Sequence, residues 1–151
     1  MMTSVPAEIF RAYDIRGIVE VTLTPAVARA IGQGLGTLAL EAGGTTIAIG
    51  RDGRLSGPSL CAALAEGIAA SGAHVIDVGM VPTPVTYFAA YHLGCGSAVV
   101  LTGSHNPPEY NGIKMVIAGT TLSGNAIQDL QAHRSRSGCL GCGHHRAARR
   151  E

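Results

Sequence analysis

Short apolar runs that alternate with longer segments of helical spacing are the feature that most constrains how this chain can fold. Residues 98–101 are all apolar, which is typical of a strand covered on both faces of a parallel sheet, since a half-exposed strand would alternate. Further strands are predicted in "TTIAIG", "AHVIDVG" and "IKMVIAG". Because strands that alternate with helices favour a layered sheet, the sequence predicts an α/β fold, a three-layer αβα sandwich with a mostly parallel mixed sheet.

The predicted helices carry capping signals at their ends. Thr24 is a preferred N-cap residue, Pro25 suits the first helical position, and Gly43 with Gly44 is expected to end the helix that begins there. Further helices are predicted in "GPSLCAALAEGIAASG", "PTPVTYFAAYHLG" and "SGNAIQDLQAH". Helices therefore separate most of the predicted strands.

Charge and composition divide the 151 residues into two parts. Residues 1–132 carry six basic and nine acidic side chains, a net charge of −3, whereas residues 133–151 carry five arginines and one glutamate, a net charge of +4. The larger part lacks the basic stripe expected of a nucleic-acid-binding domain, so no nucleic-acid partner is expected. The sequence predicts one domain over 1–132 and, over 133–151, a disordered basic tail rich in Cys, His, Arg and Gly.

The tail has two further interpretations. Cys139, Cys142, His144 and His145 are all able to bind zinc, but seven residues hold all four, unlike the separated ligand pairs of ordinary structural zinc sites. An arginine-, glycine- and alanine-rich run is also what a GC-rich gene read out of frame would produce, and this is the preferred hypothesis. Whether the truncation that it implies is natural is left open.

Targeting signals are not recognisable in the sequence. The N-terminal "MMTSVPAEIFRAYDIRG" lacks a basic region followed by an apolar one, and no run approaches the roughly 18 apolar residues of a membrane span. Cys61 and Cys95 are isolated, which does not resemble the disulfide framework of a secreted domain. A cytoplasmic location with no membrane partner is therefore expected.

The loop "TGSHNPPEYNG" contains the candidate reactive residue, a serine. Gly103 and Ser104 follow a predicted parallel strand, and ligands of open α/β sheets bind beyond the carboxyl ends of strands. The pattern is neither G-x-S-x-G nor a Walker A loop. Lys114, the only lysine in the chain, lies ten residues after Ser104. Because cationic groups stabilise phosphoryl oxygens in transit, the residues favour phosphoryl transfer to a serine.

Four motifs in order resemble one family. "TGSHNPPEYNGIKMV" resembles the phosphoserine loop of the α-D-phosphohexomutases, the phosphoglucomutases and phosphomannomutases, and "FRAYDIRG" resembles their N-terminal signature. "GRDGRLSGPSL" and "VPTPV" follow in the same order, and the similarity covers about residues 9 to 130. The bacterial phosphomannomutase/phosphoglucomutase branch is the most similar. The resemblance implies the α/β/α domain I of that family.

The resemblance also implies residue roles. Ser104 would bear the phosphoryl group that moves between C1 and C6 of a hexose phosphate through a hexose 1,6-bisphosphate. His105 and Lys114 would assist proton movement and charge stabilisation, Arg16 would contact the phosphoryl group, and Tyr13 would contact the sugar. Mg2+ would bind the phosphate on Ser104, with its other ligands in a second domain.

Simpler roles for the same residues remain open. A loop serine can cap a turn, a loop histidine can hydrogen-bond the backbone, and a strand lysine can be merely solvated. Arg16 and Arg51 could be surface ion-pair partners that contribute little energy.

Members of the family have four domains, and motifs of domains II to IV, such as D-G-D-x-D-R, are missing from this sequence. The chain is therefore expected to be a fragment that is inactive alone. The alternative is a non-catalytic remnant that binds phosphosugar or another chain. The sequence leaves open the choice of mannose or glucose, the stability of the fragment and its oligomeric state.

Overall fold

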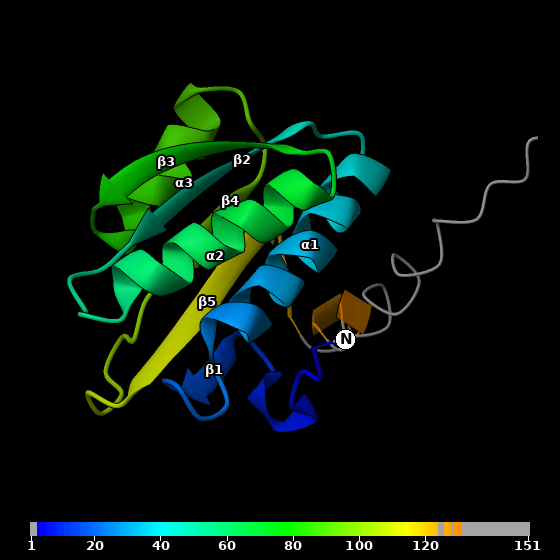
Figure 1. The fold of residues 1–151 in the computed structure, drawn as a ribbon. Helices are drawn as coiled ribbons and strands as arrows, with labels where there is room; N and C mark the ends of the chain where they lie inside the picture. The colour runs from blue at the N-terminus through cyan, green and yellow to red at the C-terminus, as the bar shows by residue number, and fades with distance from the viewer. Residues whose placement is uncertain (1–2, 124–125, 128, 131–151) are drawn as a thin grey trace, which may run out of the picture.

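The structure is a computed structural model that describes residues 3–123, 126–127 and 129–130. Among the elements that can be fully described, six strands form one mixed sheet, and three α-helices pack against it (Figure 1). In chain order the elements are η1 (Ala7–Ile9), β1 (Ile15–Ile18), α1 (Pro25–Glu41), β2 (Thr46–Arg51), α2 (Gly57–Ala70), β3 (His74–Met80), α3 (Thr83–His92), β4 (Ala98–Leu101), β5 (Tyr110–Ile117) and β6 (Thr120–Thr121). The predicted α/β class is confirmed.

The strand order is β1-β5-β4-β2-β3, with β6 paired to β5. Strand β2 pairs in parallel with β3 and β4, but the β4–β5, β1–β5 and β5–β6 pairs are antiparallel. Only two of the five pairings between described strands are parallel. The expectation of mostly parallel pairing is therefore wrong. Only residues 102–109 join β4 to β5, and a parallel crossover needs a dozen or more residues.

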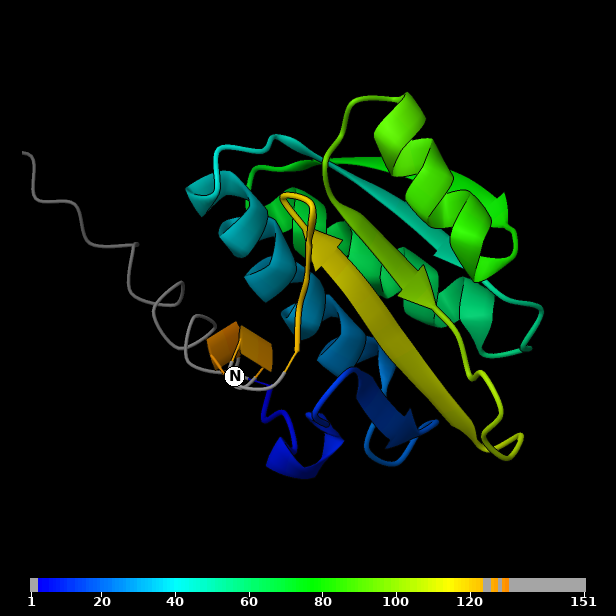
Figure 2. The ribbon, with the colours of Figure 1, turned by 180° about the vertical axis from the view of Figure 1, so that it is seen from behind.

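The three predicted layers are present. Helices α1 and α2 lie side by side on one face of the sheet, and α3 covers part of the other face, as Figures 1 and 2 show from opposite sides. The main core lies under α1 and α2, where buried aliphatic side chains of both helices meet those of the strands. Under α3 the core is small and consists of Ala48, Ala90 and Ala98. The sheet is thus anchored chiefly from the α1 and α2 side.

Helix α1 begins and ends as its sequence predicts. The backbone N–H of Val27 donates to Thr24 Oγ1 at 3.2 Å, which caps the first turn, and Pro25 occupies the first position. The helix ends at Glu41, and Gly43 follows with a φ of 86°, a left-handed conformation that glycine adopts without steric cost.

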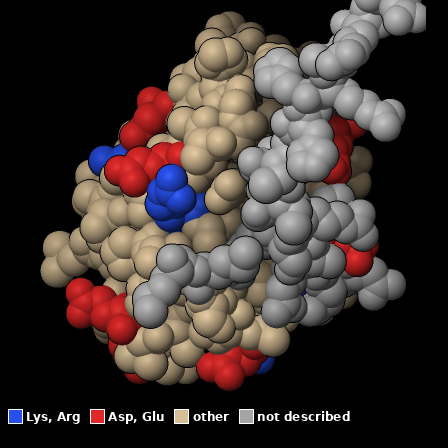
Figure 3. Space-filling model, turned by 45° about the vertical axis from the view of Figure 1, so that its right-hand side comes forward, with Lys and Arg blue, Asp and Glu red and all other residues tan. Residues whose placement is uncertain are grey.

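Several sequence predictions lie outside the described residues. These are the tail over 133–151 with its cysteines and histidines, and the boundary at 132. Of the last predicted helix, the described residues Ala126, Ile127, Asp129 and Leu130 are helical. No helix among the described residues is long and apolar enough to cross a membrane. On the face drawn in Figure 3, the visible acidic and basic side chains are few and scattered.

Candidate active site

Two loops meet at one edge of the sheet. Residues 102–109 follow β4, and residues 52–56 follow β2. Because β2 and β4 are parallel neighbours, their carboxyl ends lie side by side, which is where ligands bind in open α/β sheets. The edge therefore brings the serine loop and the "RDGR" loop into contact.

Asp52 joins the two loops. Its Oδ2 accepts hydrogen bonds from the backbone N–H of Gly103 at 2.9 Å and from Thr102 Oγ1 at 3.1 Å, and its Oδ1 accepts one from the N–H of Arg54 at 3.0 Å. Thr102 Oγ1 in turn accepts from the N–H of Ser104 at 3.1 Å. The carboxylate thus holds the first residues of the serine loop through two hydrogen bonds and its own loop through a third.

Arg54 makes the second connection. Its Nη1 donates to the carbonyl oxygens of Pro107 at 2.7 Å and Tyr110 at 2.9 Å, and its Nη2 donates to those of Asn106 at 2.6 Å and Ser104 at 3.4 Å. Its Nε lies 3.8 Å from Asp52 Oδ2. One guanidinium therefore fastens both the tip and the exit of the loop.

Ser104 has an unusual backbone conformation. Its φ is 51°, in the left-handed region that residues other than glycine seldom adopt and that tends to occur at functional sites. The residue is exposed, and its hydroxyl forms no hydrogen bond with a described residue. The loop thus presents a free hydroxyl from a backbone that is held in place.

Gly103 is required by packing and not by a left-handed backbone. The left-handed residue of the loop is its neighbour Ser104. A Cβ at Gly103 would overlap the side chain of Arg54. The glycine is needed because the guanidinium lies directly against its Cα.

Tyr13 and Arg16 lie beside the serine loop. Both line a hollow of about 570 Å³ whose wall includes Asn106 and Pro107 of the loop. Tyr13 is 80% exposed, and Arg16 Nη2 donates to Asp14 Oδ2 at 3.0 Å. Arg16 Nε is buried without a hydrogen-bond partner among the described residues. The structure therefore brings these two predicted site residues together with the loop.

The other two predicted residues are less closely tied to Ser104. His105 is the next residue in the loop and is exposed. Lys114 lies in β5 opposite Val100 and is half-buried, and no hydrogen bond or ion pair among the described residues connects it to the loop. The strand pairing places Lys114 opposite a residue that lies four positions before Ser104 in the chain, so its contact with the phosphoryl site stays a prediction.

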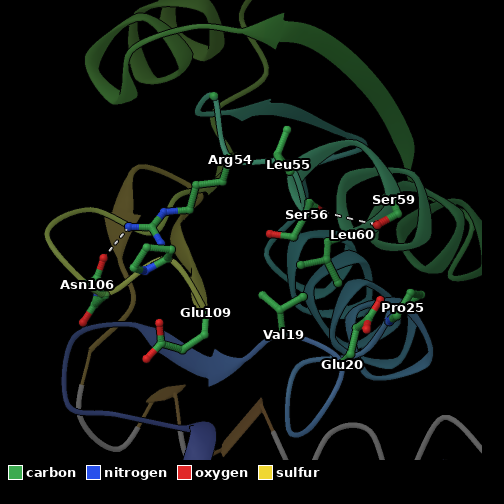
Figure 4. Close-up of a pocket in the computed structure, with 12 residues that line it drawn as sticks. Val19, Glu20, Pro25, Arg54, Leu55, Ser56, Ser59, Leu60, Asn106 and Glu109 are labelled. Atoms are coloured by element: carbon green, nitrogen blue, oxygen red, sulfur yellow. Dashed lines mark hydrogen bonds between the residues drawn. The ribbon is translucent and has the colours of Figure 1, made fainter.

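A second, larger hollow lies on the other side of Asn106. It has a volume of about 700 Å³ and is bordered by the serine loop and by the segment from Gly53 to Ser56 (Figure 4). Glu20 and Glu109 contribute carboxylates to it, whereas Val19, Leu55 and Leu60 contribute apolar side chains. Asn106 borders both hollows, so the serine loop forms a ridge between them.

The described residues do not supply a metal site by themselves. No group of three His, Cys, Asp or Glu side chains among residues 3–123, 126–127 and 129–130 could hold a metal ion. The Asp52 carboxylate, which contacts the loop, is engaged by three hydrogen bonds and lies beside the Arg54 guanidinium. A Mg2+ ion at the serine loop would therefore need ligands from outside the described residues.

Two residues that matter to the site were missed from the sequence. Asp52 and Arg54 organise the serine loop, but only Arg51 of "RDGR" was considered, and it pairs with Asp77 at 3.7 Å. Their position in the sequence could have revealed them, since "RDGR" follows a strand that ends at the same edge of the sheet as the strand before "TGSH". The order of the strands was needed to use that signal.

Comparison with known proteins identifies the family. Residues 7–137 match the family described as phosphoglucomutase/phosphomannomutase, alpha/beta/alpha domain I. The chain belongs to this family. The resemblance drawn from the motifs is thereby confirmed, together with the α/β/α fold. The match extends past residue 132, and the domain boundary expected there stays a prediction.

Relatives in the family are longer than this chain. It is 51% identical over 142 residues to a phosphoglucomutase of Neisseria meningitidis serogroup B, covering 94% of this chain and 31% of the relative. It is 56% identical over 128 residues to a phosphomannomutase/phosphoglucomutase of Pseudomonas aeruginosa, covering 85% and 28%.

A crystal structure of a phosphoglucomutase/phosphomannomutase family protein from Burkholderia thailandensis superimposes with a TM-score of 0.84 at 48% identity, covering 89% of this chain and 31% of that one. The chain therefore spans about a third of the length of the relatives that it matches.

Proposed function

We propose that this chain is the first domain of a phosphohexomutase, in which Ser104 carries the phosphoryl group transferred between C1 and C6 of a hexose phosphate. The observation that supports it most is the free, exposed hydroxyl of Ser104 on a loop held by Asp52 and Arg54, in a member of the phosphoglucomutase/phosphomannomutase family. A fixed backbone beneath an exposed hydroxyl suits a group that must accept and return a phosphoryl group in one geometry.

In the proposed step, a hydroxyl oxygen of the sugar attacks the phosphorus of phosphorylated Ser104. A new bond forms between that oxygen and phosphorus, and the bond from phosphorus to Ser104 Oγ breaks. The sugar hydroxyl gives up its proton, and Ser104 Oγ takes one up. The second half-reaction reverses this at the other end of a hexose 1,6-bisphosphate. We assign the proton transfers to His105, the exposed neighbour of Ser104.

Arg16 and Lys114 are proposed to stabilise the phosphoryl oxygens. Arg16 uses one nitrogen for Asp14, and its Nη1 forms no hydrogen bond with a described residue, so donors remain for a ligand in the hollow that it lines with Tyr13. Lys114 forms no ion pair within the described part of the chain. Tyr13 is proposed to contact the sugar ring. A cytoplasmic location remains part of this proposal.

We further propose that turnover requires more than this chain. The described residues hold no group of three metal-ligating side chains, whereas Mg2+ in the family's reaction would neutralise charge on the phosphate. The two hollows that border the serine loop are open to solvent, and phosphoryl transfer to sugar instead of water needs an enclosed site. The alternative function, a non-catalytic phosphosugar-binding remnant, differs in that Ser104 would never be phosphorylated.

The test is to incubate the 151-residue chain with glucose 1,6-bisphosphate and to locate phosphate by peptide mass spectrometry. We expect phosphate on Ser104 in the wild type and in the matched control Ser59→Ala, and none on Ser104→Ala. A parallel assay of glucose 1-phosphate conversion should stay at background. Unmodified Ser104 would favour the non-catalytic remnant, and sustained conversion would contradict the expectation that the chain is inactive alone.

A further inference from the structure

We propose that Arg54 is a positioning residue that holds Ser104 in its left-handed backbone conformation and so sets the direction of the reactive hydroxyl. The catalytic part of this inference rests on the proposed function, whereas the conformational part does not. It follows from three observations: how the donors of Arg54 are used, the strained conformation of Ser104, and the packing of Gly103 against the guanidinium.

The donors of Arg54 are committed inside the chain. An arginine has five N–H donors in a planar fork, and Nη1 and Nη2 of Arg54 donate to four backbone carbonyls of the loop and its exit. Nε, the fifth, lies beside Asp52. Its side chain is 19% exposed. The Nη donors of Arg54 are therefore used within the chain and its Nε faces a carboxylate, so its role differs from the one proposed for Arg16.

The carbonyls that Arg54 binds lie on both sides of the loop tip. Ser104 and Asn106 flank His105, and Pro107 and Tyr110 lie at the loop exit. In Figure 4 the guanidinium reaches across from its own loop to Asn106. A left-handed φ at a serine persists only when the surroundings over-determine it. The guanidinium supplies that constraint, because it fixes the carbonyl of Ser104 itself.

Gly103 and Arg54 are complementary. A Cβ at residue 103 would overlap the Arg54 side chain, so the glycine lets the guanidinium approach the backbone just before Ser104. Asp52 accepts from Gly103 N–H and faces Arg54 Nε. Only a planar fork can reach these carbonyls together, and a lysine ammonium, a point charge with three donors, cannot replace it.

The first experiment measures amide hydrogen exchange by NMR in the unphosphorylated 151-residue chain, so it does not depend on phosphorylation. In Arg54→Lys and Arg54→Met, we expect exchange at Gly103, Ser104 and Asn106 to be at least about tenfold faster. Exchange at the buried strand residues Ile49 and Val99 should not change. Arg29→Lys, an exposed arginine on α1, serves as the charge-matched control. Unchanged exchange at the loop amides would overturn the inference.

The second experiment measures the rate at which glucose 1,6-bisphosphate phosphorylates Ser104 in a single turnover. Since a small misplacement of a reacting group costs about 100-fold in rate, we expect the maximal rate to fall about 10- to 100-fold in Arg54→Met. The bisphosphate concentration at half-maximal rate should stay within about twofold, because the Nη donors of Arg54 are used by loop carbonyls and not by the ligand. Faster loop exchange with an unchanged rate would overturn the positioning role.

If the wild type is not phosphorylated, the proposed function fails, and the exchange experiment alone decides whether Arg54 holds the loop. A second variant guards against misfolding of Arg54→Met. Gly103→Ala keeps the arginine but displaces it, so it should speed up exchange at Ser104 and Asn106 in the same way. Its matched control is Gly53→Ala, whose added Cβ would lie 3.6 Å from Met80 Sδ, an ordinary contact. Equal exchange in these two glycine variants would contradict the inference.

Discussion

At the scale of single residues, the polar groups of the site divide by whether their hydrogen bonds are already made. Asp52 and Arg54 form hydrogen bonds within the chain, whereas Ser104 Oγ has no hydrogen-bond partner among the described residues. A side chain whose hydrogen bonds are made within the chain fixes the conformation of the loop. A side chain without such hydrogen bonds can react or bind a ligand. This distinction separates structural residues from reactive ones more sharply than residue type does.

Cys61 gives a prediction at the same scale. It is buried in the core, and burial first, then the nearby Asp77 carboxylate, raises the pKa of its thiol. Because the thiolate is the reactive form, we expect iodoacetamide at pH 8 to alkylate Cys61 at least about tenfold more slowly than the half-buried Cys95. Peptide mass spectrometry measures both, and unfolding in urea should remove the difference. Equal rates in the folded chain would show that the thiol is accessible.

The same shift has a consequence for stability. A raised pKa in the folded chain means that Cys61 favours folding below the ordinary thiol pKa, where both states hold the proton. That contribution is lost as the pH rises through the folded-state pKa, because the unfolded chain releases the proton first. The free energy of unfolding should therefore decline at alkaline pH less steeply in Cys61→Ala than in the wild type.

At the scale of elements, the pair of helices α1 and α2 depends on glycines inside them. A Cβ at Gly32 would overlap the backbone carbonyl of Leu64, and one at Gly67 would overlap that of Arg29. Interior glycines weaken an isolated helix by about 1 kcal/mol each relative to alanine. Here they allow two backbones to approach closely, so tertiary packing outweighs local propensity.

Gly67→Ala tests this packing. The added methyl group meets backbone that cannot move aside, so we expect the free energy of unfolding to fall by about 1–3 kcal/mol, the usual cost of overpacking. Urea denaturation followed by circular dichroism measures it. The control is Gly34→Ala in α1, where the nearest atom is Leu130 Cδ1 at 3.0 Å, the end of a flexible side chain. A similar loss in both variants would contradict the explanation.

At the scale of the whole molecule, the two faces of the sheet are unequally covered. Helices α1 and α2 bury a large core, but α3 buries little and exposes Val85, Phe88 and Tyr91 on one side, at 42%, 63% and 86%. Contiguous exposed apolar surface promotes association. Only 14% of all residues are charged, so few charges oppose it.

We therefore expect the chain to self-associate and to have low solubility. Replacing Phe88 and Tyr91 together by serine should raise the concentration at which light scattering detects association by several-fold. Val21→Ser, an exposed residue outside α3, should have little effect. A wild-type chain that stays monomeric at high concentration in sedimentation velocity would contradict this prediction.

The sequence by itself determined the α/β class, the ends of α1 and the position of the serine loop after a buried strand, because these depend on local signals. Thr24 caps a turn three residues away, and the run from Ala98 to Leu101 is buried throughout. The motifs around Ser104 were sufficient to indicate the family that the comparisons confirm.

Only the tertiary structure decided the antiparallel direction of β5 and the residues that hold the serine loop. Arg54 bonds to carbonyls 50 to 56 positions further along the chain, and Asp52 bonds to Gly103, 51 positions away. No local pattern encodes such contacts. They exist because β2 and β4 pair in parallel, which brings the carboxyl ends of two distant strands to the same edge of the sheet.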